Sequence, residues 1–290
     1  MTSELQQALS SAIREATGQA LEIRTLQPQG GGCINEAWLL EGGSQSYFVK
    51  LNTSYYLSMF KAETAALKEL AATKAIRVPQ PLTHGKAENR SYLVLEALPF
   101  GSPNSGSWEA MGQELARLHR STNVRFGWQH DNFIGSTPQQ NEWTSDWPGF
   151  FREQRLRPQF ELAQSNGYKF DHAEDLLNRI EDLLAGHTPA PSLLHGDLWS
   201  GNAGFLDDGM PVIYDPATYY GDRETDLAFS EFFGGFPASF YRAYQNEWPL
   251  PSGYEKRKIL YNLYHALNHA NLFGGGYASQ AEAIIHLLIN

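Results

Sequence analysis

The spacing of apolar residues changes once along this chain, and this change constrains the fold more than any other feature. Before Pro99, short apolar runs with strand character are separated by glycine turns, and two helical patterns lie among them. After Pro103, apolar residues fall mainly at the three- and four-residue spacing of helices. The sequence therefore predicts an α+β protein of two lobes. Residues 1–98 form a small antiparallel β-rich lobe, and residues 99–290 form a larger, mostly α-helical lobe.

The expected elements follow from periodicity and from the glycine and proline residues between them. In the first lobe, helices are predicted at residues 4–17 and 56–72, and strands at residues 21–26, 36–40, 46–51 and 91–97. In the second lobe, helices are predicted at residues 108–119, 150–163 and 173–184, and short strands at residues 192–194, 203–206 and 211–214. The remainder, from residue 224, is predicted to be mainly helical.

The composition is that of a globular protein and excludes several classes of function. The 290 residues carry a formal net charge of -10, which disfavours nucleic acid or an anionic membrane surface as the main partner. No stretch of about 18 apolar residues is present, so no membrane span is expected, and the cytoplasm is the expected location. The single cysteine, Cys33, excludes an intramolecular disulfide and a cysteine-rich metal site.

Three oxygen-bearing residues in the second lobe have the spacing that phosphoryl transfer requires. Asn202 follows Asp197 by five residues, as in the kinase catalytic loop, and Asp215 follows a short apolar strand, where kinases place a metal-binding aspartate. Asp197 is predicted to be the catalytic base, while Asn202 and Asp215 would bind Mg²⁺. Singly, Asp197 and Asn202 each fit an ordinary turn or cap position. His195 is expected to brace this loop by hydrogen bonding, because Asp197 already fills the role of base.

The first lobe contains residues suited to binding a nucleotide. Lys50 ends an apolar strand, from which its amine can reach nucleotide phosphates, and Glu63 on the following helix is its expected ion-pair partner. Gly30, Gly31 and Gly32 between two strands would let backbone N–H groups approach the phosphates. No Walker A lysine follows them, and taken alone this run also fits a flexible hairpin tip.

Four longer strings resemble the fructosamine kinase (ketosamine 3-kinase) family. They are HGDLWSGN at residues 195–202, YDPA at 214–217, GDRETDLA at 221–228 and NEWTSDWPGFFREQRL at 141–156. The similarity extends from the glycine run almost to the C-terminus. The family is related to aminoglycoside phosphotransferases and choline kinases, and the resemblance implies their protein-kinase-like fold. It also implies ATP-dependent phosphorylation of the 3-hydroxyl of sugar ketoamines carried by amines or protein lysines, after which the unstable phosphate leaves and the amine is deglycated.

The resemblance also implies roles for particular residues. Lys50 would hold the phosphates of ATP with Glu63 as its partner, the backbone of Glu96, Ala97 and Leu98 would contact adenine, and the glycine run with Cys33 would cover the nucleotide. Asp226 would accept backbone hydrogen bonds from the catalytic loop.

The resemblance implies that the acceptor site lies near Asn141, Trp143 and Trp147. Flat aromatic faces there, and at Trp199, suit a sugar ring. Large aromatic residues are also usual in protein cores, so Trp143 and Trp147 remain open to either interpretation, and Trp199 could wedge the catalytic loop.

Cys33 and the acceptor leave further hypotheses open. Cys33 is expected either to be a small apolar filler or to form a disulfide between two chains that regulates activity, in a protein that is otherwise a monomer or homodimer. A kinase of an aminoglycoside or a choline-like compound is the main alternative, since the nucleotide machinery does not define the acceptor. A non-catalytic nucleotide-binding module would not need Asp197, and a protein kinase is disfavoured because no Ala-Pro-Glu segment follows Asp215.

Overall fold

The structure of the protein is a computed structural model that describes residues 1–30, 34–43 and 45–290. The chain divides into two compact units, residues 1–107 with 203–215, and residues 108–202 with 216–290. This division differs in two ways from the expected lobes, which meet at residue 98. The first unit continues to residue 107, and it also takes in a hairpin, residues 203–215, that the sequence places in the second lobe.

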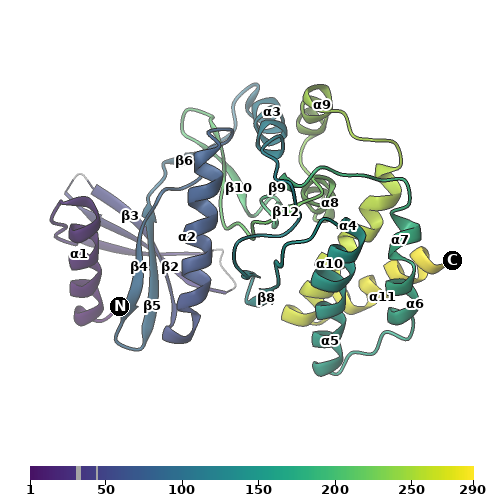
Figure 1. Ribbon diagram of the computed structural model, residues 1–290. Coiled ribbons are helices and arrows are strands. Elements are labelled where there is room, and N and C mark those ends of the chain that lie inside the picture. Colours follow the sequence, from purple (N-terminus) through teal and green to yellow (C-terminus); the bar gives the residue numbers. More distant parts are fainter. Residues whose placement is uncertain (31–33, 44) are drawn as a thin grey trace. The chain divides into compact units, whose positions relative to one another are not determined.

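The first unit is built around a five-stranded antiparallel sheet in the order β1-β2-β3-β5-β4. Its elements are α1 (Ser3–Thr17), β1 (Thr25–Gln29), β2 (Glu36–Gly42), β3 (Gln45–Thr53), η1 (Ser54–Tyr56), α2 (Leu57–Ala72), β4 (Pro81–Ala87), β5 (Arg90–Glu96) and β6 (Phe100–Gly101), followed after the second unit's first part by β10 (Ala203–Leu206) and β11 (Pro211–Ile213). Helices α1 and α2 lie on either side of the β4–β5 hairpin (Figure 1).

The two-residue period of β3 decides which side chains meet each helix. Tyr47, Val49 and Leu51 are buried in one apolar cluster with the inner face of α1. Lys50 points to the opposite face, where its amine reaches Glu63 on α2. A lysine in the middle of a buried strand is thereby directed to a carboxylate on the covering helix.

The hairpin of β10 and β11 joins the first unit through β6. Phe205 pairs with Gly101 and Leu206 with Phe100, which gives the three-stranded sheet β11-β10-β6. A Cβ on Gly101 would lie 2.7 Å from the Cα of Asp207, so only glycine permits this close pairing. The sequence did not indicate β6, because two residues between prolines carry no periodic pattern.

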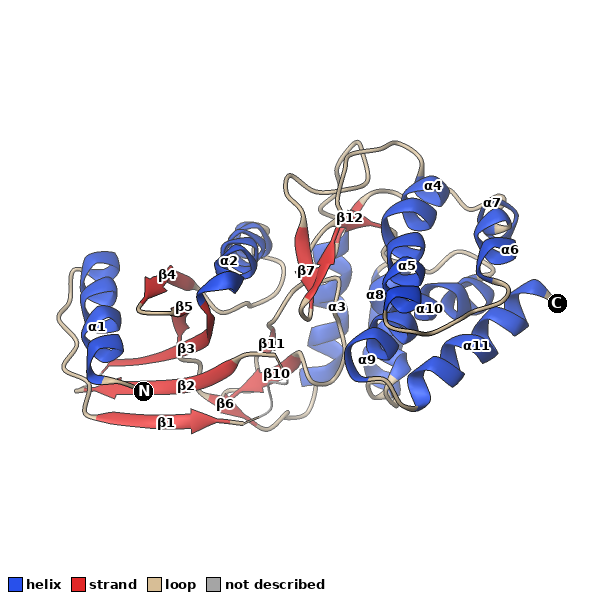
Figure 2. Ribbon diagram, turned by 90° about the horizontal axis from the view of Figure 1, so that it is seen from below, coloured by secondary structure: helices blue, strands red, loops and turns tan. Residues whose placement is uncertain are grey.

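The second unit is mainly helical (Figure 2). Its elements are α3 (Ser107–His119, whose first residue belongs to the first unit), β7 (Asn132–Ile134), β8 (Thr137–Gln139), α4 (Trp147–Phe151), the π-helix η2 (Arg152–Leu156), α5 (Arg157–Ser165), α6 (Ala173–Asn178), α7 (Ile180–Leu183), β9 (Ser192–Leu193), β12 (Tyr220–Gly221), α8 (Glu224–Phe232), α9 (Ala238–Glu247), α10 (Tyr254–Phe273) and α11 (Gly276–Ile289). Helix α10 is central and packs against α5, α8 and α11.

The α+β class and the separation of a sheet-rich part from a helical part are confirmed. Four local predictions were inexact. The first strand begins at Thr25 rather than at residue 21, and β4 was missed because it begins with Pro81 and contains Gly85. The helix expected over residues 150–163 is two α-helices joined by a π-helix, and the helix expected over residues 173–184 is divided into α6 and α7. Within the part of the chain that the structure describes, no helix is long and apolar enough to cross a membrane.

Candidate active site

In the first unit, Lys50 joins two carboxylates that are far apart in the sequence. Its Nζ lies 2.5 Å from Oε1 of Glu63 and 2.5 Å from Oδ1 of Asp215. Lys50 and Glu63 are buried, whereas the side chain of Asp215 is 46% exposed. The predicted pair of Lys50 and Glu63 is present, and Asp215 is a partner that the sequence did not suggest.

This arrangement keeps the lysine charged. Burial alone would lower the pKa of Lys50, but the carboxylates of Asp215 and Glu63 raise it above its usual value. Removing either carboxylate would leave part of the lysine charge uncompensated in a poorly hydrated place. Lys50, Glu63 and Asp215 therefore form one electrostatic unit.

Asp215 has a backbone conformation that few residues other than glycine adopt. Its φ is +58°, in the left-handed region, which aspartate tolerates better than most residues. Only Oδ1 bonds to Lys50; Oδ2 makes no hydrogen bond among the described residues. A half-exposed carboxylate with one uncommitted oxygen is a suitable ligand for a hard cation such as Mg²⁺.

Only part of the glycine segment can be described. Gly31, Gly32 and Cys33 lie outside the described residues, so the interpretations placed on them remain predictions. Gly30 follows β1, and a Cβ there would meet no atom within 4 Å. After the gap, the side chain of Asn52 donates hydrogen bonds to the carbonyl of Ile34 and to Oδ1 of Asn35, which fixes the start of β2 to β3.

The segment predicted to contact adenine follows β5. The carboxylate of Glu96 accepts hydrogen bonds from Arg77 at 2.6 Å and from the backbone N–H of Gln80 at 2.5 Å. Its side chain is therefore committed to local structure. The backbone of residues 96–98 remains the candidate contact, as the sequence predicted.

In the second unit, Asn202 holds Asp197 with a single side-chain nitrogen. Its Nδ2 donates to the carbonyl oxygen and to Oδ2 of Asp197, at 2.9 Å each, and its own backbone N–H donates to Trp199. The amide oxygen Oδ1 of Asn202 makes no hydrogen bond among the described residues and is available to a cation. The five-residue spacing thus places Asn202 in direct contact with Asp197, and the roles predicted for the two residues stay predictions.

Asp226, at the start of α8, anchors the catalytic loop. Its carboxylate accepts the backbone N–H groups of His195 at 2.7 Å and Gly196 at 2.8 Å, which confirms the role implied by the resemblance. It also accepts Nε2 of His119 at 3.1 Å, and this buried histidine was not predicted. Burial would raise the pKa of Asp226, but hydrogen bonds and the charge of His119 lower it.

Glycine at position 196 has a steric cause. Its φ is +83°, and a Cβ would lie 2.1 Å from the carbonyl oxygen of Ala217. The kinase pattern has arginine at this position. Here the backbone of the following segment occupies the space of any side chain.

His195 is completely buried, and its Nδ1 accepts the backbone N–H of Asp197 at 3.2 Å. Its own carbonyl accepts the N–H of Ala217 at 2.9 Å. These contacts confirm the prediction that His195 braces the loop.

The four residues expected at the acceptor site differ in exposure. Asn141 and Trp147 are buried; both ends of the Asn141 amide are hydrogen-bonded, and the indole N–H of Trp147 donates to Tyr261. For Trp147 this supports the core interpretation that the sequence left open. Trp143 and Trp199 are half-buried, so they remain candidates for contact with a substrate.

Trp199 belongs to an aromatic group that the sequence did not reveal. Its ring meets Phe233 at 5.3 Å between centroids, and Phe233 meets His269 at 5.1 Å. Nδ1 of His269 is 2.8 Å from the carbonyl of His265, so this nitrogen carries the proton and Nε2 is an acceptor. In the sequence, the only signal for His269 was its place in the helical spacing of α10.

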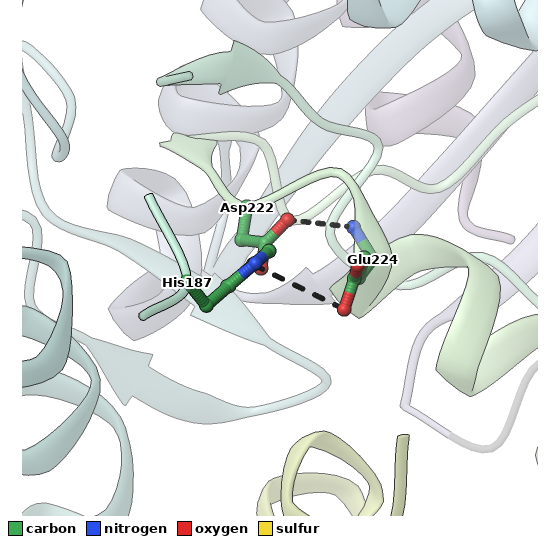
Figure 3. A group of neighbouring side chains, drawn as sticks. All are labelled: His187, Asp222 and Glu224. Carbon is green, nitrogen blue, oxygen red and sulfur yellow. Dashed lines mark hydrogen bonds and ion pairs between the residues drawn. The ribbon is translucent and has the colours of Figure 1, made fainter. Parts of the chain in front are cut away.

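A further cluster of titratable groups lies in the second unit, where His187, Asp222 and Glu224 point toward one another (Figure 3). Nε2 of His187 is 2.6 Å from Asp222. Arg257 donates two hydrogen bonds of 2.7 Å to the two oxygens of Glu224, and Tyr261 donates to Asp222. Because these donors already occupy the carboxylates, the cluster is better explained as an ion-pair network between α8 and α10 than as a metal site.

The fold and these residues define a phosphotransferase of the protein-kinase-like class. A model of the fructosamine kinase family matches residues 5–290, and the chain belongs to that family. A "Probable ketoamine kinase" of Synechocystis sp. is 51% identical over 280 residues, covering 96% of this chain and 95% of that protein. A chloroplastic protein-ribulosamine 3-kinase of Arabidopsis thaliana is 42% identical over 274 residues, covering 92% and 83%.

Solved structures agree with this assignment. The crystal structure of a "Putative fructosamine-3-kinase" from Haemophilus somnus 129PT is 33% identical, covers 100% of both chains and has a TM-score of 0.94. An aminoglycoside phosphotransferase, APH(4)-Ia, solved with ADP and hygromycin B, is 16% identical with a TM-score of 0.64 and shows the fold alone. The predicted family and the predicted enzyme class, a kinase acting on a hydroxyl group, are confirmed.

Proposed function

We propose that this kinase uses ATP and Mg²⁺ to phosphorylate the 3-hydroxyl of a sugar ketoamine, of the ribulosamine or fructosamine type, on a small amine or a protein lysine. Loss of the unstable 3-phosphate then releases the amine. The names of its relatives support the ketoamine class of acceptor. The nucleotide found with APH(4)-Ia supports ATP as the donor.

The observation that carries the mechanism is the hydrogen bonding of Asp197. Asn202 orients the carboxylate, and Asp226 holds the backbone immediately before it, so Asp197 is preorganised to accept the proton of the acceptor hydroxyl. Lys50 donates to the phosphates of the donor, while Glu63 and Asp215 maintain its charge.

Asn202 and Asp215 are the proposed ligands of Mg²⁺, since each has a side-chain oxygen without a partner among the described residues. The cation neutralises charge on the phosphates when it is bound. On the acceptor side, Trp143 and Trp199 are the half-buried aromatic residues that would contact the sugar.

The test is ATP turnover with a panel of ribulosamines, fructosamines, aminoglycosides and choline. Ketoamines should be the preferred acceptors. Asp197→Asn should lower kcat by about 10²- to 10⁴-fold with little change in the KM for ATP, because a base acts only on the chemical step. Asp171→Asn, which changes an exposed carboxylate paired with Lys169, is the matched control. Turnover of aminoglycosides alone, or full activity of Asp197→Asn, would refute the proposal.

Two finer predictions accompany this function. A disulfide between the Cys33 residues of two chains would make activity redox-dependent; non-reducing gels and activity with and without dithiothreitol would test it. If the activity of the Cys33→Ser protein responds to dithiothreitol as the wild-type activity does, the prediction is wrong. The cytoplasmic location expected from the sequence remains a prediction, which fractionation of the source cells can check.

A further inference from the structure

Arg155 is a completely buried cation whose hydrogen bonds, among the described residues, go to neutral oxygens. Its Nη1 donates to the carbonyl oxygens of Gln140 at 2.6 Å and Gln154 at 2.8 Å, and its Nη2 donates to Oδ1 of Asn141 at 2.7 Å. Within the described part of the chain, its Nε has no hydrogen-bond partner. The guanidinium carbon lies 4.0 Å from the ring centre of Tyr219 and 4.5 Å from that of Phe150. Aromatic faces and neutral oxygens therefore surround the guanidinium group.

This burial is costly, because an arginine cannot give up its proton and an apolar side chain would be easier to bury. The neighbouring Arg152 and Arg157 instead pair with Glu153 near the surface. The segment Arg152–Leu156 is a π-helix, a rare geometry that is frequent at functional sites. A buried charge held by neutral oxygens and an Nε without a hydrogen bond among the described residues lie in one irregular turn, and they call for an explanation beyond packing.

Arg155 leads into a buried cluster of three side-chain amides. Asn141, whose oxygen it holds, donates from Nδ2 to Oδ1 of Asn132 at 2.8 Å. Gln139 donates from Nε2 to the same oxygen of Asn132 at 2.8 Å, and its own oxygen accepts the hydroxyl of Tyr264 at 2.7 Å. All three amides are almost completely buried. Because the hydrogen bonds fix the orientation of every amide, the cluster has one arrangement.

The amide cluster ends on the backbone segment that packs against the catalytic loop. Asn132 donates to the carbonyl of Thr218 at 2.7 Å, and Gln139 donates to the carbonyl of Ala217 at 3.1 Å. Ala217 in turn donates to the carbonyl of His195 at 2.9 Å, two residues before Asp197. The path from Arg155 to the loop is thus continuous hydrogen bonding and covalent backbone.

Burial raises the pKa of Tyr264, the charge of Arg155 lowers it, and the charge of Asp197 raises it. Both charges therefore act on the hydroxyl that Gln139 accepts.

We propose that Arg155 is a positioning residue for phosphoryl transfer, which fixes the catalytic loop through the amides of Asn132, Gln139 and Asn141. The proposal rests on the function proposed above, in which Asp197 is the base. A displacement of the base by a fraction of an ångström slows the chemical step without changing how ATP binds. A purely structural arginine would instead affect stability alone.

The test compares Arg155→Lys with Arg257→Lys. Both changes keep a buried positive charge and lose a forked set of hydrogen bonds, but Arg257 binds Glu224 and does not contact the amide cluster. Active sites are counted by titration with a non-hydrolysable ATP analogue, and kcat is expressed per site. Arg155→Lys should lower kcat about tenfold or more at unchanged KM for ATP. Arg257→Lys should lower the melting temperature at unchanged kcat.

Gln139→Leu provides a second variant, since it removes the donor to Ala217 and leaves Arg155 in place. It should reproduce the loss in kcat, and the double variant with Arg155→Lys should be no slower than the slower single variant. Wild-type kcat per site in Arg155→Lys, or in Gln139→Leu if the former does not fold, would overturn the inference. Asp197→Asn distinguishes failure of the proposed function from failure of the positioning role. If Asp197→Asn is fully active, Asp197 is not the base. If Asp197→Asn is inactive and Arg155→Lys is fully active, only the positioning role is refuted.

Discussion

Replacing Lys50 with methionine removes the cation shared by Glu63 and Asp215. Breaking a buried ion pair on one side costs about 3–5 kcal/mol. The exposure of the two carboxylates narrows this range. Without Lys50, the half-exposed carboxylate of Asp215 can be hydrated by water. Glu63 on α2 is buried, so its carboxylate can be neutralised only by taking up a proton. Protonating a carboxyl group of ordinary pKa, about 4.3, at pH 7 costs about 3.7 kcal/mol. Lys50→Met should therefore lower the free energy of unfolding by about 3–4 kcal/mol at pH 7.

The cost should depend on pH. Burial and the charge of Asp215 raise the pKa of Glu63, and Lys50 lowers it, so removing Lys50 raises the pKa of Glu63 further in the folded state. When a carboxyl group has a higher pKa in the folded state than in the unfolded state, the free energy of unfolding decreases as pH rises between the two pKa values. Lys50→Met should thus be closest to wild type near pH 5 and fall away from it towards pH 8.

The second variant, Lys50→Met with Glu63→Gln, removes the buried charge altogether. It should recover about 2–3 kcal/mol of the loss at pH 7, and its stability should depend less on pH. Both variants should be inactive, because neither has the lysine that donates to the phosphates. Urea unfolding followed by far-ultraviolet circular dichroism at pH 5.5 and 8, with kinase assays, gives both quantities. If the double variant is no more stable than Lys50→Met, Glu63 is not the group that Lys50 neutralises.

Three further predictions concern the second unit and α1. Gly196→Ala should lower the free energy of unfolding by more than about 2 kcal/mol and reduce kcat, because its Cβ would lie 2.1 Å from a carbonyl oxygen. The control, Gly18→Ala, has a similar φ and open space around the Cβ. It should cost only about 1–2 kcal/mol without loss of activity. Trp147→Phe should reduce the melting temperature at unchanged acceptor KM, while Trp143→Ala should raise the acceptor KM; the opposite pattern would exchange their roles. Asp226→Asn should cost about 1–3 kcal/mol at pH 7 and reduce kcat. Because the pKa of Asp226 is lowered, its contribution is present above the unfolded pKa and is lost as pH falls through the folded value, so the cost should shrink below pH 4 in acid titrations.

Features that depend on local periodicity or on fixed spacing could be predicted from the sequence. Helix α1 begins and ends within one residue of its predicted bounds, and β10 matches fully, because amphipathic patterns and glycine ends are local signals. The spacing of Asp197 and Asn202 indicated a catalytic loop, and the contact of Lys50 with Glu63 followed from their positions along the chain. The contact of Lys50 with Asp215 did not, since 165 residues separate them and only the assembled first unit brings them together.

Polar residues in the interior mark where sequence reasoning failed, and the reason is physical. Asn132 and Gln139 are paired residues of the short β7–β8 hairpin, and Asn141 follows it. Asparagine and glutamine beside such short segments usually occupy exposed turns. A polar side chain can be buried only when all its partners are present, and those partners come from the segment after Asp215 and from the π-helix that carries Arg155. Neither segment has a periodic pattern that predicts such a meeting. The residues that fix the catalytic loop are therefore the ones whose burial depends on the whole second unit being folded.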